Sequence, residues 1–196
     1  VHVPTCPGQD PSQYVLKDLI WIDGVTEFNG NEIYAARSRS VFAWQDNTSP
    51  LAAPIRWTNT TVWHNSGSGI RAYAIPVPAI IDGYVQINDP TLMPRMVDAT
   101  GKVTHSRGDN SAFVFAGGRT NAFHINNARV ENCGWGIWSR PRGEGKLLSV
   151  TNSTFRNACN VEIFPNTEVG VEVILKDCTL GDPSGKAAFD AHMDSE

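Results

Sequence analysis

The sequence has few charged residues, no long apolar run and few cysteines. Charged residues make up 18% of the 196 positions, and 16 Lys and Arg against 20 Asp and Glu give a net charge of −4. This weak negative charge excludes a strongly basic nucleic-acid binder. A hydrophobic fraction of 41%, with six Trp, excludes a wholly disordered chain. Because no stretch reaches about 18 apolar residues, we expect no membrane span.

The cysteine pattern indicates neither a disulfide scaffold nor a zinc site. Cys6, Cys133, Cys159 and Cys178 are too few for such a scaffold, and none lies in a C-x-x-C pair. The spacing of Cys133 and Cys159 allows either a disulfide between neighbouring repeats or a column of buried thiols. The chain begins at Val1, so we expect it to be processed or excised.

A 25-residue recurrence organises the carboxyl half. Three apolar columns repeat at this offset, together with one amide or carboxylate column. Alternating apolar positions predict β-strands, and the Asn or Asp that follows predicts a sharp turn with left-handed backbone. The columns are Phe123, Leu148 and Val173; Ile125, Val150 and Leu175; Val130, Phe155 and Leu180; and Asn127, Asn152 and Asp177.

The amino half shows a looser form of the same pattern. Here the predicted offset is 30 residues, and a more degenerate coil is predicted to start near Ile20. The alignment matches Ile55, Trp57, Asn59 and Val62 with Val85, Ile87, Asp89 and Leu92.

A repeat of roughly 22 to 30 residues with three short strands cannot bury a core alone, so neighbouring repeats must stack. On this coil pattern, across residues 15–182, the sequence resembles the right-handed parallel β-helix superfamily, the pectate-lyase-like fold, with no signature of a specific family. We predict an all-β fold, a right-handed parallel β-helix (solenoid) of about five to six coils with inserted loops. The alternative is an antiparallel sandwich, which gives no reason for the polar column to recur in register.

The chain, residues 1–196, is predicted to form a single β-helix domain. Residues 1–14 are expected to form an amino-terminal cap or arm, residues 15–182 the coils, and residues 183–196 a tail. If that tail leaves the last coil open, a partner chain or a homo-oligomer is expected to cap it. Inserted loops, which often carry binding and chemistry, are predicted at 37–54, 93–112 and 141–146.

The resemblance also sets the register, because an Asn in this superfamily typically lies at the tight turn after the second strand. It implies strand two at 123–126, strand three at 129–132 and strand one at 136–140. Inward-pointing side chains are then Phe123, Ile125, Val130 and Ile137, and the outward column of strand one carries Arg71, Trp138, Arg140 and Glu162.

This outward column and the nearby loops form the candidate site. An acidic sugar chain presents flat apolar ring faces and carboxylates, which a trough of Trp and Arg suits. The alternative is that these residues are solvated side chains on ordinary loops. The candidate catalytic residues are Arg107, Asp109, Arg140 and Glu162, and the candidate substrate-binding residues are Arg71, His105, Trp138 and Arg142.

Two mechanisms compete at this site. β-Elimination on a uronate needs a base for the C5 proton and a cation for the carboxylate, which Arg107 or Arg140 with a bound Ca²⁺ could supply, since the lyases that the chain resembles use Arg or Lys bases. Hydrolysis needs two carboxylic acids at a controlled separation, for which Asp109 and Glu162 are the best pair. The close Asp pair of the polygalacturonases in this superfamily is missing. Metal ligands stay unknown.

The sequence therefore favours an extracellular carbohydrate-directed β-helix protein, secreted or on the cell surface. It is expected to bind an acidic polysaccharide and to cleave it, if it is an enzyme at all, as a polysaccharide lyase. The alternative is a non-catalytic structural or adhesive β-helix subunit or fragment that docks on a partner chain. No nucleic-acid partner is expected.

Overall fold

Three parallel β-sheets, called A, B and C here, make up the fold. The computed structural model describes residues 27–34, 39–44, 54–65, 67–73, 75, 77–90, 111–117, 122–141, 146–163 and 171–181. Sheet A contains β1 (Glu27–Asn29), β4 (Ile55–Thr58), β7 (Ala79–Asp82), β10 (Phe123–Asn126), β13 (Lys146–Thr151) and β16 (Val171–Lys176). Sheet B contains β2 (Glu32–Tyr34), β5 (Thr61–Trp63), β8 (Val85–Ile87), β11 (Arg129–Glu131), β14 (Thr154–Arg156) and β17 (Thr179–Gly181). Sheet C contains β3 (Arg39–Trp44), β6 (Ser68–Tyr73), β9 (Ser111–Gly117), β12 (Trp135–Pro141) and β15 (Cys159–Ile163).

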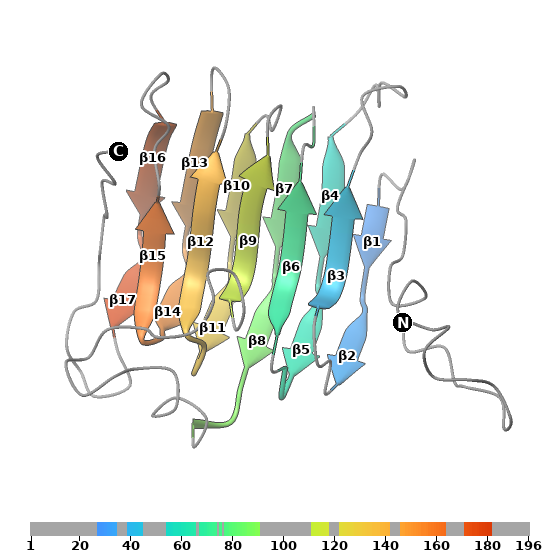
Figure 1. Cartoon of the computed structure of the whole chain (residues 1–196), viewed down its shortest axis with the longest axis vertical. Helices are drawn as coiled ribbons and strands as arrows, with labels where there is room; N and C mark the ends of the chain where they lie inside the picture. Colours follow the sequence, from blue (N-terminus) through green and yellow to red (C-terminus); the bar gives the residue numbers. More distant parts are fainter. Residues whose placement is uncertain are drawn as a thin grey trace, which may run out of the picture.

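The chain winds through the sheets in the order A, B, C and then returns to A one strand further along (Figure 1). In Figure 1 the strands of sheet C run upward in front and those of sheet A run downward behind, while the coils advance away from the amino end. This winding is right-handed, the hand that crossover connections between parallel strands strongly favour. The predicted parallel solenoid is confirmed, and six, six and five strands per sheet agree with five to six coils.

The 25-residue columns are confirmed in the carboxyl half. Phe123 lies beside Leu148, and Leu148 lies beside Val173 in the next coil. In sheet B, Val130 lies beside Phe155. All strand pairs of the described residues are parallel, so the antiparallel sandwich is excluded for this part of the chain.

The predicted 30-residue offset of the amino half is wrong. Ile55 pairs with Ala79 and Trp57 with Ile81, which is an offset of 24 residues. The turn that matches Asn59 is formed by Gly83, whose φ is +67°, and not by Asp89. A glycine adopts left-handed backbone without an amide side chain, so a search for Asn or Asp cannot find this turn. The coil predicted near residue 20 lies outside the described residues.

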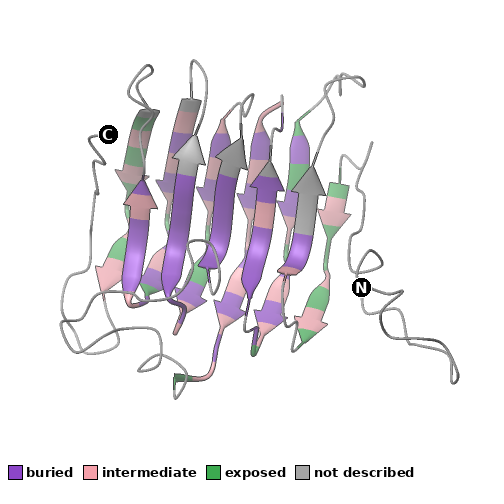
Figure 2. Ribbon diagram, viewed as in Figure 1, coloured by how far each residue is buried: buried purple, intermediate pink, exposed green. Residues whose placement is uncertain are grey.

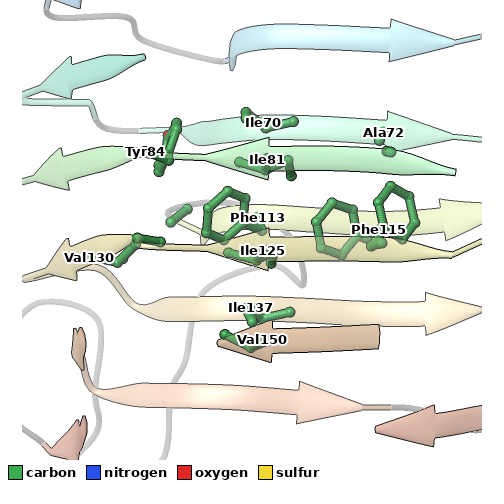
Figure 3. Packing of buried hydrophobic residues seen from close by; sticks show 14 of the residues in the cluster. Ile70, Ala72, Ile81, Tyr84, Phe113, Phe115, Ile125, Val130, Ile137 and Val150 are labelled. Carbon is green, nitrogen blue, oxygen red and sulfur yellow. The ribbon is translucent and has the colours of Figure 1, made fainter. Parts of the chain in front are cut away.

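A single apolar core fills the solenoid between the three sheets (Figure 2). Aromatic rings gather at its centre, where Phe113 and Phe115 of β9 lie between the strands of sheets C and A (Figure 3). The ring centroids of Phe115 and Phe123 are 3.8 Å apart, and the two ring planes are nearly parallel. Each fully buried side chain of this kind contributes about 1.5–3 kcal/mol. The four residues predicted to point inward are all buried: Phe123, Ile125, Val130 and Ile137.

The predicted loops are shorter than expected where the structure describes them. Residues 39–44, placed in a loop by the sequence, form β3 and begin sheet C. β9 begins at Ser111, inside the loop predicted at 93–112. β12 ends at Pro141 and β13 begins at Lys146, so both ends of the loop predicted at 141–146 belong to strands. The remaining loop residues and both predicted terminal segments, 1–14 and 183–196, lie outside the described residues. No helix in the described part of the chain is long and apolar enough to cross a membrane.

The turn between sheets A and B, called the A–B turn here, has left-handed backbone in every described coil. Its backbone N–H groups bond to carbonyl oxygens of the next coil, as Asn127 does to Thr151 at 3.1 Å. The predicted column of Asn127, Asn152 and Asp177 is in register, and the Asn127 side chain also bonds from coil to coil, since its Nδ2 donates to Asp82 Oδ1 of the preceding coil at 2.8 Å. The residues with positive φ in this turn are Gly30, Asn59, Gly83, Asn127, Asn152 and Asp177.

The turn between sheets B and C, called the B–C turn here, contains a ladder of buried amides that the sequence analysis missed. Asn88 Oδ1 accepts from the backbone N–H of Asn65 at 2.9 Å, and Asn88 Nδ2 donates to Cys133 Sγ at 3.4 Å. One coil further, Asn157 Oδ1 accepts from the backbone N–H of Cys133 at 2.9 Å. The ladder continues at Asn160, whose Oδ1 accepts from the Asn157 backbone N–H at 2.9 Å and whose Nδ2 donates to the Gly181 carbonyl oxygen at 3.1 Å. Side chains here replace strand-to-strand backbone bonds inside the protein.

Candidate functional site

The outer face of sheet C carries the predicted column. Arg71 on β6 and Trp138 on β12 both lie beside Val114 of β9, and Trp138 lies beside Glu162 of β15. Adjacent strands are about 4.8 Å apart, so the backbones of Arg71 and Glu162 are separated by about 14 Å. The structure therefore brings Arg71, Trp138 and Glu162 into one line across the coils.

Trp138 is not a free aromatic surface, since only 6% of it is exposed. It packs with Val114, Trp135 and Cys159 in a buried cluster that is separate from the core, called the outer apolar cluster here. Between Trp135 and Trp138, the position of Gly136 faces the core, where a Cβ would lie 2.7 Å from Phe155 Cδ1. Trp138 is thus covered by its neighbours on the outer side of sheet C, whereas the prediction placed it in an open trough that a sugar could contact.

The two charged members of the column, Arg71 and Glu162, are partly exposed. Arg140 lies two residues beyond Trp138 on β12, and its backbone pairs with that of Ala116 on β9. The structure does not describe its side chain. The remaining candidates, His105, Arg107, Asp109 and Arg142, lie outside the described residues.

The two carboxylates that hydrolysis needs are not both among the described residues. Glu162 is the one carboxylate on the described strands of sheet C, and its predicted partner Asp109 is not among them. The described residues contain no group of three or more His, Cys, Asp or Glu side chains that could hold a metal ion.

The described cysteines are free thiols, not the disulfide that the spacing allowed. Cys133 lies in the core and Cys159 in the outer apolar cluster, on opposite sides of sheet C. Burial raises the pKa of Cys133, so its thiol stays protonated and unreactive. Burial, and to a lesser extent the nearby Cys133, also raise the pKa of Tyr84 well above its ordinary value. Neither group has the depressed pKa of an activated nucleophile.

A second surface group on sheet B was missed by the sequence analysis. Glu32 and Tyr34 of β2 lie beside Thr61 and Trp63 of β5 on the outer face of that sheet, and His64 follows at the turn. We call Glu32, Tyr34, Trp63 and His64 the aromatic platform. The sequence feature that could have revealed this group is the offset of 29 residues between Ile33 and Val62, which pair in the structure. The predicted 30-residue offset does not include this pair.

The fold defines the class of this protein, a right-handed parallel β-solenoid with two differently decorated outer faces. No protein-family model matches the chain, and no curated protein or solved structure gives a match. The class of the protein therefore follows from the arrangement of its strands alone.

Proposed function

We propose that this protein is an extracellular carbohydrate-binding β-solenoid that takes an acidic polysaccharide on the outer face of sheet C. The observation that carries the proposal is the column in which Arg71, Val114, the buried Trp138 and Glu162 follow one another on successive strands. Kinship with the pectate-lyase-like superfamily is part of the proposal, and the repeated coil and turn pattern supports it.

The solenoid geometry suits a linear polymer. Coils repeat every 4.8 Å or so along the axis, so an extended chain meets equivalent backbone positions as it crosses successive strands. The guanidinium of Arg71 can bind a uronate carboxylate through two parallel hydrogen bonds. The outer apolar cluster fixes the strands beneath it, which keeps the charged positions at constant separation.

Cleavage, where it occurs, would proceed by β-elimination. A base removes the C5 proton of the uronate, the electron pair moves to form the C4–C5 double bond, and the C4–O bond to the leaving sugar breaks. Arg140 or Arg107 is proposed as the base, and an added cation, Ca²⁺ or a second Arg, would neutralise the uronate carboxylate. Asp109 and Glu162 remain the candidate pair for hydrolysis.

Binding and cleavage can be tested separately on the whole chain. Electrophoresis through gels that contain polygalacturonate, alginate or another uronate polymer, with Ca²⁺ or with a chelator, should retard the protein. The Arg71→Ala variant should bind at least about tenfold more weakly, because a charge-assisted hydrogen bond is lost. Arg156→Ala, an exposed arginine on sheet B, is the matched control and should bind like the wild type.

Absorbance of unsaturated sugar ends reports elimination. If the lyase proposal is right, Arg140→Ala or Arg107→Ala should remove product formation and keep most of the binding. Binding without any product would mean that the protein binds the polysaccharide and does not cleave it. No retardation by any uronate polymer would overturn the proposed function.

A second candidate function, a structural subunit that docks on a partner chain, is favoured by the end coils. Six of the seven core residues that stay partly exposed lie in the first or last described coil, where Figure 2 shows pink and green strands. They are Phe28 and Ile33 at one end and Val173, Leu175, Cys178 and Leu180 at the other. Sedimentation equilibrium tests the case in which the partner is a second copy of this chain, since a monomer at all concentrations contradicts that case.

A further inference from the structure

The aromatic platform on sheet B is the most exposed aromatic surface among the described residues. Tyr34 is 71% exposed, whereas the core aromatics are buried and Trp138 is covered. Tyr34 lies directly beside Trp63 of the next coil, so the two rings leave the same face of the sheet on neighbouring strands. Tyr34 is exposed and Trp63 is half-buried, and aromatic rings that reach the surface side by side commonly mark a binding surface.

Hydrogen bonding and ring contacts hold this platform in a defined arrangement. Trp63 Nε1 donates to Glu32 Oε1 at 3.0 Å, across the diagonal between β5 and β2. The ring of His64 meets that of Tyr34 edge to face, with centroids 5.5 Å apart and planes at 69°. The rings are therefore partly ordered before any ligand arrives, which lowers the entropic cost of binding.

The charge of this surface differs from that of sheet C. The outward side chains of β2, β5 and β8 in the described chain include one carboxylate, that of Glu32, and no Lys or Arg. Beyond the platform, the same face continues with Val85 and Ile87. An acidic sugar on the platform would meet the charge of Glu32 and no Lys or Arg of β2, β5 or β8. Arg129 on β11, two strands beyond β5, already pairs with Glu131, so this surface disfavours the ligand proposed for sheet C.

We infer that the aromatic platform is a second ligand site, for a neutral saccharide that stacks on Tyr34 and Trp63. Pyranose rings have an apolar face of C–H groups that packs on aromatic rings, and their hydroxyl groups can donate to the free lone pairs of the Glu32 carboxylate and bond to the His64 imidazole. A small cation is bound best where rings enclose it. Two rings side by side on a sheet form instead an open surface, which suits a sugar face.

This inference goes beyond the proposed function and does not depend on it, because the two sites lie on different sheets. The probes are three soluble neutral polysaccharides, a β-glucan, a xylan and a galactomannan, with polygalacturonate and choline for comparison. The wild-type chain should be retarded in gels by at least one neutral polymer. Tyr34→Ala should weaken that binding at least about tenfold, because the buried ring area of the complex is lost.

Matched variants separate stacking from loss of folding. Tyr34→Phe keeps the ring and should retain most of the binding. Ile174→Ala removes the other large exposed hydrophobic side chain, which is 40% exposed on β16, and should leave binding unchanged. Polygalacturonate binding should be the same in all three variants if the sheet C site also exists.

Three results would overturn the inference. They are no retardation of the wild type by any of the neutral polymers, neutral-polymer binding that is unchanged in Tyr34→Ala, and a Tyr34-dependent fluorescence response to choline without one to the saccharides. Loss of uronate binding alone would overturn the proposed function of sheet C and leave this site standing.

Discussion

The two tight turns of each coil use asparagine for different physical purposes, although both connect short parallel strands. In the A–B turn, exposed residues such as Asn127 and Asn152 supply left-handed backbone. In the B–C turn, buried residues such as Asn88 and Asn157 supply side-chain hydrogen bonds to backbone groups of neighbouring coils. One turn is therefore defined by a backbone conformation, and the other by a hydrogen-bond requirement.

This difference predicts different sensitivities to substitution. An exposed turn residue can be replaced by any residue that tolerates positive φ, and glycine already does so at Gly30 and Gly83. A buried amide cannot be removed without leaving a backbone N–H unsatisfied in the interior. Substitutions in the two turns should therefore lower the free energy of unfolding by different amounts.

The largest effect is expected for glycine substitutions. At Gly136, just after the B–C turn, a Cβ would lie 2.6 Å from the Asn160 carbonyl oxygen and 3.0 Å from Asn157 Nδ2, so Gly136→Ala should cost about 3 kcal/mol or more. Gly30 of the A–B turn has nothing within 4 Å, so Gly30→Ala should cost only the strain of left-handed backbone, about 1 kcal/mol. Urea denaturation measures both, and equal losses would contradict the comparison.

Removal of a buried amide should come next. Asn157→Ala removes the acceptor of the Cys133 N–H and the donor to the Val130 carbonyl oxygen, and should lower the free energy of unfolding by about 2–3 kcal/mol. Asn127→Ala in the A–B turn loses one exposed bond to Asp82 and places alanine at φ of +54°, and should cost about 1–2 kcal/mol. Thermal and urea unfolding give the two values, and a costlier Asn127→Ala would reverse the assignment.

The buried thiol of the B–C turn should make stability depend on pH. Burial raises the pKa of Cys133 in the folded chain, whereas an unfolded cysteine ionises near pH 8.5. The stabilisation is therefore complete below about pH 8.5, and the free energy of unfolding falls above it by up to about 1.4 kcal/mol per pH unit. Urea denaturation from pH 7 to 10 measures this slope.

Cys133→Ser is the control, because it keeps a hydrogen-bonding group that does not ionise in this range. The difference in slope between wild type and variant isolates Cys133 from the other titrating groups. Identical slopes would show that Cys133 is not buried as a neutral thiol.

The smallest effect is expected for glycine at the A–B turn. Asn152 is exposed with φ of +49°, and glycine adopts this conformation without strain. Asn152→Gly should change the free energy of unfolding by less than about 0.5 kcal/mol, since its greater unfolded-state entropy offsets the easier turn. Asn152→Val, a β-branched residue, should cost about 1–2 kcal/mol. Calorimetry of both variants checks the order.

The sequence predicted the carboxyl half of the fold well because its physical signals are local. The columns of Phe123 and Ile125 repeat at a constant offset, and Asn127 marks the turn that follows. In the amino half Gly83 replaces the amide, and glycine occurs in too many contexts to fix a register. The B–C ladder escaped because Asn88, Cys133 and Asn157 differ in residue type and do not lie at one common offset.

The candidate site was predictable only as a column of backbone positions. Alternation along β12 correctly placed Ile137 inward and Trp138 outward. It could not predict that Trp138 would be buried, because that depends on tertiary packing around Trp135 and Cys159. The aromatic platform depends on the register of β2 against β5, which the periodicity of the amino half did not fix.

Cysteine cross-linking tests the stacking of coils most directly. Arg129, Thr154 and Thr179 follow one another in register on the outer face of sheet B. The pairs Arg129→Cys with Thr154→Cys and Thr154→Cys with Thr179→Cys should each form a disulfide, because adjacent strands are about 4.8 Å apart. Arg129→Cys with Thr179→Cys spans two coils, about 9.6 Å, and should not form one. Peptide mapping that finds the long-range disulfide, or neither of the adjacent ones, would contradict the parallel solenoid.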